Sequence, residues 1–497
     1  MFYRIIAQVS LKHILLVALL FRIIAAFWSK GFAFSDDHYE VVELAQKWRE
    51  GIPFIEPGKE VYLFSLFYPG LHYLIFDACN ALGITDPQSM MLVVRLFHAL
   101  VSLLAVYYGY LLALRISGSK DVAVISGLLL AVLWFFPFMS VRSLREFFCI
   151  PFLMAGSYYL TNQYRNWTSV LLPAFFFALA VSIRLQCVLI PAATGLLLFF
   201  SKKHFQKGLF FGIAFLVFFG LTHGLFDFLY YGNPIASIME YMAYNSNPEN
   251  IKGYPQGPWY RYIGTVAGML LGISFFPLAW GYVISFRLSY QHLLLFIASL
   301  FFFAFHSYYP NKQERFITPF IPYFIILGVN GFYVFYNRNK EKKWLVGLTR
   351  FTTTWFVILN TAGLFILSFS YSKRSRVESM SYLYKKGDVT NIVLEGHQST
   401  AGLLPFYLGK RLNHYTLSAE RDIKDLKAEI QSGEKPAPNY LIMTGNIDTA
   451  KRLIRIRELF PDIRHEKDVQ TGFLDNIAHR LNPKYNKNES WFIYKIK

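Results

Sequence analysis

Long apolar stretches recur along the sequence as far as residue 371, and they constrain the fold more than any other feature. A helix that crosses a membrane needs about 20 consecutive, mostly apolar residues. About eleven stretches approach or exceed that length, and they cover residues 12–30, 88–114, 121–139, 146–162, 168–183, 187–200, 208–228, 262–286, 290–307, 316–336 and 351–371. The sequence therefore predicts an all-α polytopic membrane protein.

The composition supports this prediction. Hydrophobic residues make up 54% of the chain and charged residues only 16%, whereas soluble domains carry about 25% charged residues. These values exclude a soluble globular enzyme and a disordered chain. The net charge of +18 is expected to record membrane orientation rather than nucleic-acid binding, because Lys and Arg collect in cytoplasmic loops.

The basic residues predict the orientation of the chain. If the N-terminus is cytoplasmic, the inner loops hold Arg115, Lys202, Lys203 and many other basic residues, and only Asp121 and Glu341 oppose them. This distribution follows the rule that positive charge stays on the cytoplasmic side. With an odd number of spans, the segment after residue 371 lies outside the cytoplasm.

The composition changes after residue 371, where charged residues become frequent. Short β-like runs occur at 391–394, 440–443 and 491–494, and helix-like runs at 419–431 and 449–459. This alternation is typical of a small α/β domain. We therefore expect a membrane domain at residues 1–371 and an extracytoplasmic α/β domain at residues 372–497.

Two long outer loops, about residues 30–87 and 229–261, are expected to carry function, since long ordered loops usually do. In the first loop, residues 37–49 and 65–82 are typical of helices that lie in the membrane interface. The cysteines do not suggest a disulfide framework or a zinc site, because they lie far apart in sequence in apolar surroundings; they are Cys79, Cys149 and Cys187.

Asp36 and Asp37 directly follow the first apolar stretch. Carboxylates near the hydrocarbon region are costly unless they are paired or used. One interpretation is a general base at the membrane surface. The other is structural, with Asp36 as the N-cap of the interfacial helix and Asp37 at the positive end of that helix.

Three outer cations indicate an anion site. Lys312 and Arg315 lie between the ninth and tenth stretches, and Arg184 lies in the turn between the fifth and sixth. Positive charge on the outer side runs against the general bias, so a lipid phosphate is a natural ligand. Snorkelling at the interface is the structural alternative for Lys312 and Arg315.

Other buried or outer charges favour structural roles. Arg142, Arg145 and Glu146 flank an outer turn, where a structural Arg–Glu pair is the main expectation and a role in substrate binding is the alternative. Arg22 and Arg95 fall inside apolar stretches, where they are expected to pair with a loop carboxylate or to reach the interface. No pair of histidines has the spacing of a metal site, so no metal is expected.

Several motifs, in order along the chain, resemble those of a known family. They lie at residues 34–43, 65–69, 227–232 with 241–245, 254–260 and 311–322. On these segments the chain resembles the GT-C glycosyltransferases, and among them the polyprenyl- or dolichyl-phosphate-mannose-dependent α-mannosyltransferases of glycosyltransferase family 22. Two departures stand out, because Asn311 replaces a family His and Gln313 a family Glu.

The resemblance implies a function and a set of roles. It implies transfer of a sugar, expected to be mannose, from a polyprenyl-phosphate donor to a lipid-linked or glycan hydroxyl, with inversion and without a metal cofactor. By this resemblance Asp36 is the base and Asp37 orients Asp36 or holds the acceptor. The resemblance also implies that the donor phosphate is bound by Arg184, Lys312 and Arg315. It implies that the acceptor or the sugar is contacted by His38, Tyr39, Trp259 and Tyr260.

The predicted outer domain is more typical of bacterial lipid-phosphate-sugar transferases than of family 22, which favours a bacterial inner membrane with the active site facing the periplasm. Two alternatives stay open. One is a GT-C transferase for another sugar or acceptor, such as lipid A or protein. The other is a transporter or flippase of lipid-linked sugars, for which inverted repeats and charges at the membrane midplane would be expected.

Overall fold

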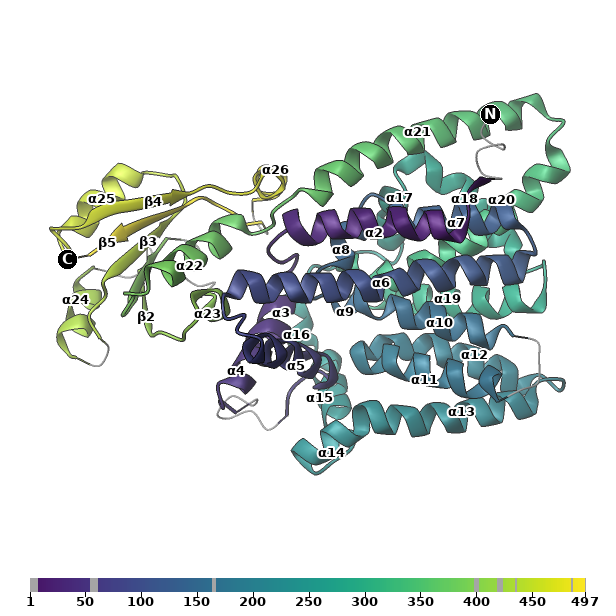
Figure 1. The fold of residues 1–497 in the computed structure, drawn as a ribbon, viewed down its shortest axis with the longest axis horizontal. Helices are drawn as coiled ribbons and strands as arrows, with labels where there is room; N and C mark the ends of the chain where they lie inside the picture. Colours follow the sequence, from purple (N-terminus) through teal and green to yellow (C-terminus); the bar gives the residue numbers. More distant parts are fainter. Residues whose placement is uncertain are drawn as a thin grey trace. The chain divides into compact units, whose positions relative to one another are not determined.

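A computed structural model of the chain describes residues 8–53, 61–162, 167–396, 402–417, 423–433, 436–483 and 486–496. The chain forms two compact units, and Figure 1 labels many of their helices and strands. The first unit comprises Met1–Ala26, Gly51–His72 and Arg95–Ser368, and the second comprises Phe27–Glu50, Tyr73–Val94 and Phe369–Lys497. Compact units need not coincide with domains, so the domain boundary after residue 371 stays a prediction.

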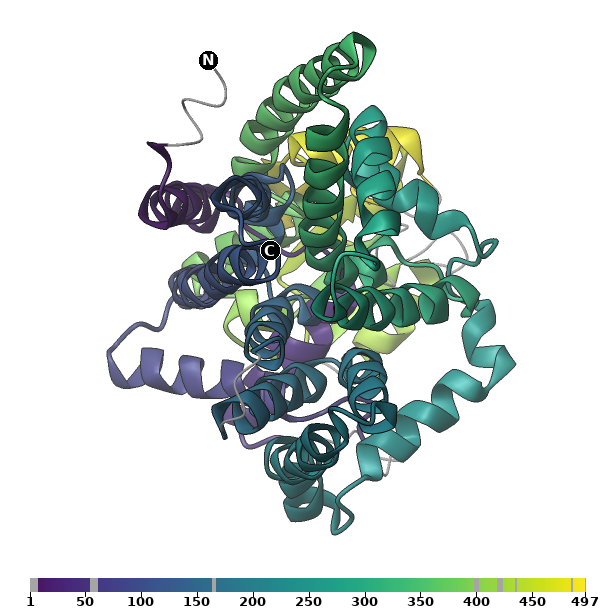
Figure 2. The same ribbon diagram turned by 90° about the vertical axis from the view of Figure 1, so that its right-hand side faces the viewer.

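The first unit is helical, and many of its helices run side by side, so that Figure 2 looks along their axes. The helices are α2 (Leu11–Trp28, which ends in the second unit), α6 (Pro87–Ser117, which begins in the second unit), α7 (Lys120–Val132), α8 (Phe136–Ser140), α9 (Arg145–Phe148), α10 (Ile150–Leu160), α11 (Thr168–Ile183), η2 (Leu185–Val188), α12 (Leu189–Phe200), α13 (Phe205–Phe219), η3 (Gly220–Gly224), α14 (Leu225–Tyr231), α15 (Ala236–Ser246), α16 (Pro248–Lys252), α17 (Arg261–Met269), η4 (Gly272–Ser274), α18 (Phe275–Ser285), α19 (Tyr290–Tyr308), η5 (Glu314–Phe320), α20 (Ile321–Asn339) and α21 (Lys343–Ser368).

The predicted apolar stretches are helical, which confirms an all-α integral membrane architecture. Among the described residues, six helical segments are long and apolar enough to cross a membrane, or seven if one bent pair is a single span. The other stretches contain shorter helices, such as α10 with 11 residues and α12 with 12. The predicted number of about eleven spans therefore exceeds the number of helices of full spanning length.

The prediction of one continuous helix over residues 262–286 is wrong. The chain bends by 105° between α17 and the segment Gly272–Ser285. Leu271, at φ 61°, and Gly272, at φ 71°, both adopt left-handed backbone conformations there. The indole N–H groups of Trp134 and Trp355 donate to carbonyl oxygens at the break, at 2.9 Å to Met269 and 2.8 Å to Leu271. These donors satisfy backbone groups that a bend in an apolar setting would otherwise leave unpaired.

Helices α18 and α20 approach closely through glycine. A Cβ atom added at Gly281 would overlap the carbonyl oxygen of Gly328, and one added at Gly331 would overlap the carbonyl oxygen of Gly281. Small residues allow such backbone contact between helices in a membrane protein, where dispersion packing drives association. This contact helps to fix α20, whose N-terminal side carries the 311–322 motif.

We expect Gly281→Ala to lower the melting temperature of the purified protein, because the new methyl group meets backbone rather than a flexible side chain. Overpacking of this kind costs about 1–3 kcal/mol. Gly212→Ala in α13 is the matched control, since a Cβ atom there has no neighbour within 4 Å. Thermal unfolding in detergent measures both variants, and equal melting temperatures for Gly281→Ala and wild type would contradict the close packing.

Arg22 does not follow either pattern expected for an arginine inside an apolar stretch. Arg22 is buried and donates to the hydroxyl of Ser102 at 2.7 Å and to the carbonyl oxygen of Ala131 at 2.9 Å. Arg95 donates to the carbonyl oxygen of Ala26 at 2.6 Å. Backbone carbonyls near helix C-termini carry partial negative charge, so they can stabilise a buried guanidinium without a carboxylate.

The second unit contains a five-stranded sheet in the order β2-β1-β3-β5-β4. Strand β1 pairs in parallel with β2 and β3, whereas β5 pairs antiparallel with β3 and β4. The helices and strands of this unit are α3 (Ser35–Asp37), η1 (His38–Glu43), α4 (Leu44–Arg49), α5 (Phe67–Ala81, begun in the first unit), α22 (Arg374–Lys386), β1 (Ile392–Glu395), α23 (Pro405–Leu408), β2 (His414–Leu417), α24 (Ile423–Gln431), β3 (Tyr440–Thr444), α25 (Thr449–Arg457), β4 (Arg464–Val469), α26 (Phe473–Leu481) and β5 (Trp491–Lys495).

Side chains of the sheet alternate between two hydrophobic clusters. Ile392 and Leu394 of β1 pack in one cluster with residues of α22 and α4. Val393 lies in the other cluster with residues of α24 and α25. The sheet is therefore covered on both faces, which explains why β1 and β3 read as continuous apolar runs. The predicted small α/β domain is confirmed.

The helices predicted in the first outer loop are also present. Residues 35–49 form α3, η1 and α4 in succession, and α5 covers most of the predicted helix at 65–82. The predicted run at 419–431 begins outside the described residues, and α24 covers its remainder from Ile423. Position in the membrane interface stays a prediction for the outer-loop helices.

Candidate active site

Arg184 occupies a break between two apolar helices of the first unit. Helix α11 ends at Ile183 and η2 begins at Leu185, and Arg184 between them is extended, with φ −143° and ψ 106°. Its backbone N–H still donates to the carbonyl oxygen of Ala180, at 3.0 Å. The break projects the side chain into protein, where only 6% of Arg184 is exposed.

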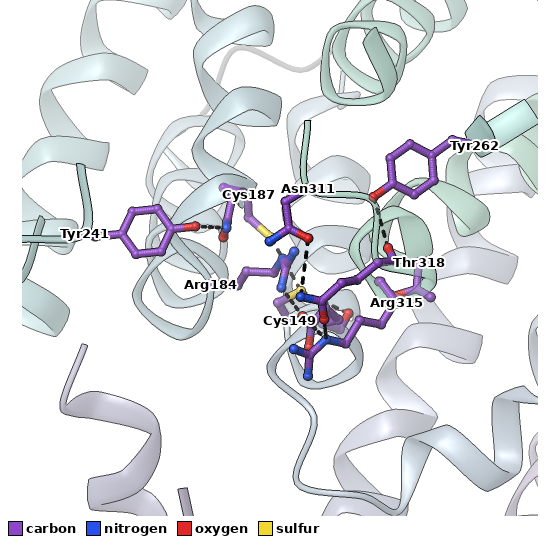
Figure 3. Close-up of polar contacts among 11 residues, drawn as sticks. Cys149, Arg184, Cys187, Tyr241, Tyr262, Asn311, Arg315 and Thr318 are labelled. Carbon is purple, nitrogen blue, oxygen red and sulfur yellow. Dashed lines mark hydrogen bonds and ion pairs between the residues drawn. The ribbon is translucent and has the colours of Figure 1, made fainter. Parts of the chain in front are cut away.

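Glu146, in the four-residue helix α9, is the carboxylate that Arg184 contacts. Its Oε1 atom accepts a hydrogen bond from Nη1 of Arg184 and lies 3.5 Å from Nε of Arg315. Glu146 is 2% and Arg315 is 5% exposed. Figure 3 shows the two arginines converging from separate elements. The three residues form a buried ion cluster, which we call the Glu146 cluster.

Arg315 is oriented by the chain that precedes it. Its Nε atom donates to Oε1 of Gln313 at 3.1 Å, and the amide of Gln313 donates to Oδ1 of Asn311 at 3.4 Å. The hydroxyl of Tyr262 donates to the carbonyl oxygen of Gln313 at 3.0 Å. The ring of Phe316 lies 4.9 Å from the guanidinium carbon of Arg184 and 5.5 Å from that of Arg315. Figure 3 labels Tyr262, Asn311 and Arg315 in this region and marks hydrogen bonds there with dashed lines.

The 227–245 segment braces the turn that carries Arg184. Asp227 accepts hydrogen bonds from the backbone N–H and the hydroxyl of Ser237, at 2.9 and 2.7 Å, and so anchors the start of α15. Further along α15, the hydroxyl of Tyr241 accepts a hydrogen bond from the amide of Gln186. Burial raises the pKa of Tyr241 to about 12, so this hydroxyl stays neutral at ordinary pH.

The electrostatics of the Glu146 cluster fit an anion. Two guanidinium groups, those of Arg184 and Arg315, face the single carboxylate of Glu146, so these three side chains together leave an excess of positive charge. Among the described residues, no group accepts a hydrogen bond from Nε or Nη2 of Arg184, and none donates to Oε2 of Glu146. Unmet buried donors of a charged group are costly, and a bound anion would satisfy those of Arg184.

Lys312 does not share this geometry. Its ammonium group is buried and donates to the carbonyl oxygens of His306 at 2.8 Å, Ser307 at 2.6 Å and Tyr309. An ammonium group has three N–H donors, so these carbonyls at the C-terminal end of α19 use all of them. This arrangement favours a helix-capping role, and phosphate binding by Lys312 stays a prediction.

Asp36 and Asp37 lie in the second unit, in the first turn of α3. Phe34 occupies the N-cap position, so the structural interpretation of Asp36 as the N-cap is wrong. Asp37 is buried and Asp36 is half-buried. The π-helix η1 begins at the next residue, and π-helical turns are frequent at functional sites. Roles for the two carboxylates in catalysis stay predictions.

The residues predicted to contact sugar differ in their surroundings. His38 is buried between the rings of Phe32, at 4.7 Å, and Tyr407, at 5.4 Å. The hydroxyl of Tyr39 donates to the carbonyl oxygen of Leu403 at 3.3 Å. Trp259 and Tyr260, in contrast, are 66% and 57% exposed. His38 has the surroundings of a core residue, and contact with a sugar stays a prediction for all four residues.

Glu146, expected from the sequence mainly in a local Arg–Glu pair, joins Arg184 and Arg315 at the centre of the cluster. Its partners Arg184 and Arg315 are far along the chain, so no local spacing could reveal them. A carboxylate within an apolar region was the available signal. Two of the three free cysteines also meet here: the Sγ atoms of Cys149 and Cys187 lie 3.5 Å apart (Figure 3).

Comparison with known proteins gives matches over most of the chain. The model of the Alg9-like mannosyltransferase family matches residues 13–399. GPI mannosyltransferase 3 of Yarrowia lipolytica is 23% identical over 383 residues, which cover 76% of this chain and 72% of that protein. The mannosyltransferase APTG1 of Arabidopsis thaliana is 22% identical over 530 aligned positions, which cover 95% of this chain and 93% of that protein.

Two solved structures share the fold. The structure of ArnT from Cupriavidus metallidurans bound to undecaprenyl phosphate superposes with a TM-score of 0.60, at 13% identity and over 97% of both chains. The apo oligosaccharyltransferase of Archaeoglobus fulgidus superposes with a TM-score of 0.56, at 11% identity, over 90% of this chain and 71% of that one.

Proposed function

Because the chain belongs to the Alg9-like mannosyltransferase family, we propose that it transfers mannose from a polyprenyl-phosphate donor to a hydroxyl of a lipid-linked or glycan acceptor. Its family and its GT-C fold make it an integral-membrane glycosyltransferase. Beyond the family and the fold, three points are proposed here: the donor, the class of acceptor and the side of the membrane on which transfer takes place.

The Glu146 cluster is the observation that carries the choice of donor. Two buried arginines meet there, and Nε and Nη2 of Arg184 have no hydrogen-bond acceptor among the described residues. A guanidinium edge with two parallel N–H groups matches two oxygens of a phosphate. ArnT, which shares the fold, binds undecaprenyl phosphate in its crystal structure, and this agrees with a lipid-phosphate donor.

The proposed reaction is a single displacement with inversion. The acceptor oxygen attacks the anomeric carbon, the bond from that carbon to the phosphate oxygen breaks, and the acceptor proton passes to Asp36. Asp37 orients Asp36 or the acceptor. Arg184 and Arg315 stabilise the charge that develops on the leaving phosphate, as preorganised cations do in a water-poor site. Because guanidinium groups supply that charge, we expect the reaction to need no metal.

We further propose that transfer takes place on the extracytoplasmic side, with the C-terminal domain on the same side, and that the membrane is a bacterial inner membrane. The excess of Lys and Arg in alternate loops supports this orientation. A polyprenyl-phosphate sugar presents its phosphate at the membrane surface, which is compatible with cations close to the outer ends of helices.

The test uses purified protein in lipid vesicles with polyprenyl phosphomannose, or with GDP-mannose as the competing donor class, and a panel of glycan and lipid-linked acceptors. Mass spectrometry should detect a mannosylated acceptor with the lipid donor alone, and a chelator should leave the rate unchanged. Mannosylation from GDP-mannose instead would contradict the proposed donor. Movement of the lipid-linked sugar across the vesicle without transfer would favour a transporter.

A further inference from the structure

Glu146 is a buried carboxylate to which the proposed function gives no role. Its Oε1 atom accepts from Nη1 of Arg184 and lies 3.5 Å from Nε of Arg315, and the side chain is almost fully enclosed. If the site only bound phosphate, the two arginines would bind the phosphate more tightly in the absence of the Glu146 carboxylate. A fixed negative charge beside an anion site weakens anion binding, so its presence calls for a physical account.

The geometry places this charge next to the expected phosphate position. Glu146 occupies one edge of the Arg184 guanidinium, through Nη1, and the donors left without an acceptor among the described residues, Nε and Nη2, are on the other edge. A phosphate on that second edge would share the same guanidinium with the carboxylate. The two anions would therefore lie on opposite sides of one planar cation, close enough to repel each other in a buried setting.

We propose that Glu146 is a specificity-determining residue, whose fixed negative charge favours the singly charged phosphodiester of the donor over the doubly charged phosphomonoester that transfer releases. The inference rests on the proposed function, since it takes the donor to be a polyprenyl-phosphate sugar. Cleavage of the bond between the anomeric carbon and the phosphate oxygen leaves the electron pair on that oxygen, and the acceptor proton leaves to Asp36.

The selectivity follows from the charge of each anion. A phosphodiester carries one negative charge, whereas a phosphomonoester carries about 1.5–2 at neutral pH because its second pKa is about 6. The repulsion from one fixed carboxylate is proportional to the charge of the ligand, so it acts up to about twice as strongly on the product. Glu146 thus promotes release of the spent lipid phosphate at some cost in donor affinity.

Glu146→Gln removes the charge and keeps the shape and one acceptor oxygen. The probes are polyprenyl phosphate and its methyl diester, which carry the same lipid, lack a sugar and differ in charge. We compare the dissociation constant of the monoester divided by that of the diester at pH 7.5. This ratio should be about tenfold lower in Glu146→Gln than in the wild type, because the variant binds the monoester relatively more tightly. Glu146→Asp keeps the charge and should keep the wild-type ratio.

A second neutral variant and a control guard against unfolding. If Glu146→Gln does not fold, Glu146→Met takes its place, because methionine has a similar volume and no charge. The same shift in the ratio of dissociation constants is expected for it. Asp121→Asn is the matched control, because Asp121 also accepts a hydrogen bond within the first unit, from Tyr333 at 3.2 Å. Its ratio should equal that of the wild type. A merely structural role for Glu146 would lower both affinities by the same factor and leave the ratio unchanged, which would overturn the proposal.

The pH dependence supplies a further readout. At pH 5 the monoester carries about one charge, so the difference between wild type and Glu146→Gln should shrink. Contributions from neighbouring groups, including His306, cancel because both proteins contain them. Failure of the wild type to bind either probe would instead overturn the proposed donor. The charged and titratable groups around the cluster are Arg145, Arg184, Arg315, Cys149, Cys187, Tyr241, Tyr262 and His306.

Discussion

Asp36→Asn is expected to lower the turnover number by about 10²–10⁴-fold. The amide has nearly the same size and can still accept a hydrogen bond from the acceptor hydroxyl, but it cannot take up the proton. The loss should therefore fall on turnover, with little change in the Michaelis constant for the donor. Initial rates with purified protein, saturating acceptor and varied lipid donor measure this split.

Two further variants sharpen the test of Asp36. Asp36→Glu keeps a carboxylate and should retain more activity than Asp36→Asn. Glu40→Gln is the matched control, because Glu40 is another half-buried carboxylate only four residues away and should leave turnover near the wild-type value. Turnover of Asp36→Asn close to that of wild type would rule out Asp36 as the base.

The helical architecture was predictable because the membrane imposes it. An apolar stretch of about 20 residues has few alternatives to a helix in a bilayer, since every backbone group must be satisfied within the segment. The break at Leu271 was not predictable in this way. It depends on indole donors from Trp134 and Trp355, which are distant in sequence, so the hydropathy of residues 262–286 contains no sign of it.

In the sheet, the buried strands were predictable from the sequence, whereas the charged edge strand β4 was not. Strands β1, β3 and β5 were predicted because their side chains are buried on both faces and read as apolar runs. Strand β4, Arg464–Val469, was missed because it lies at an edge of the sheet and consists mostly of charged residues. A solvated edge strand takes its conformation from its partner, here β5, rather than from its own pattern.

The candidate site was predictable only in part. Arg184 and Arg315 stood out as cations on the side where positive charge is scarce, and the structure brings both to Glu146. Lys312 stood out for the same reason, yet its ammonium group caps the end of α19. Position in the sequence identifies a charge, whereas its partners depend on tertiary packing.

Arg184→Lys is expected to raise the Michaelis constant for the lipid donor by about ten- to a hundredfold and to leave that for the acceptor nearly unchanged. Lysine keeps the positive charge beside Glu146, so the buried carboxylate stays compensated, but it lacks the planar pair of N–H groups that matches two phosphate oxygens. Hydrogen bonds to charged groups contribute about 1.5–3 kcal/mol, which corresponds to that range.

Arg22→Lys is the matched control for Arg184→Lys, because Arg22 is equally buried in the first unit but donates to Ser102 and to backbone carbonyls. It should lower thermal stability without a selective effect on the donor. Binding of polyprenyl phosphate, measured on the same preparations, should weaken for Arg184→Lys and not for Arg22→Lys. Equal rises in the constants for donor and acceptor in Arg184→Lys would mean that Arg184 supports the fold of the site rather than the phosphate. The Glu146 cluster would then be a structural ion pair with no ligand of its own.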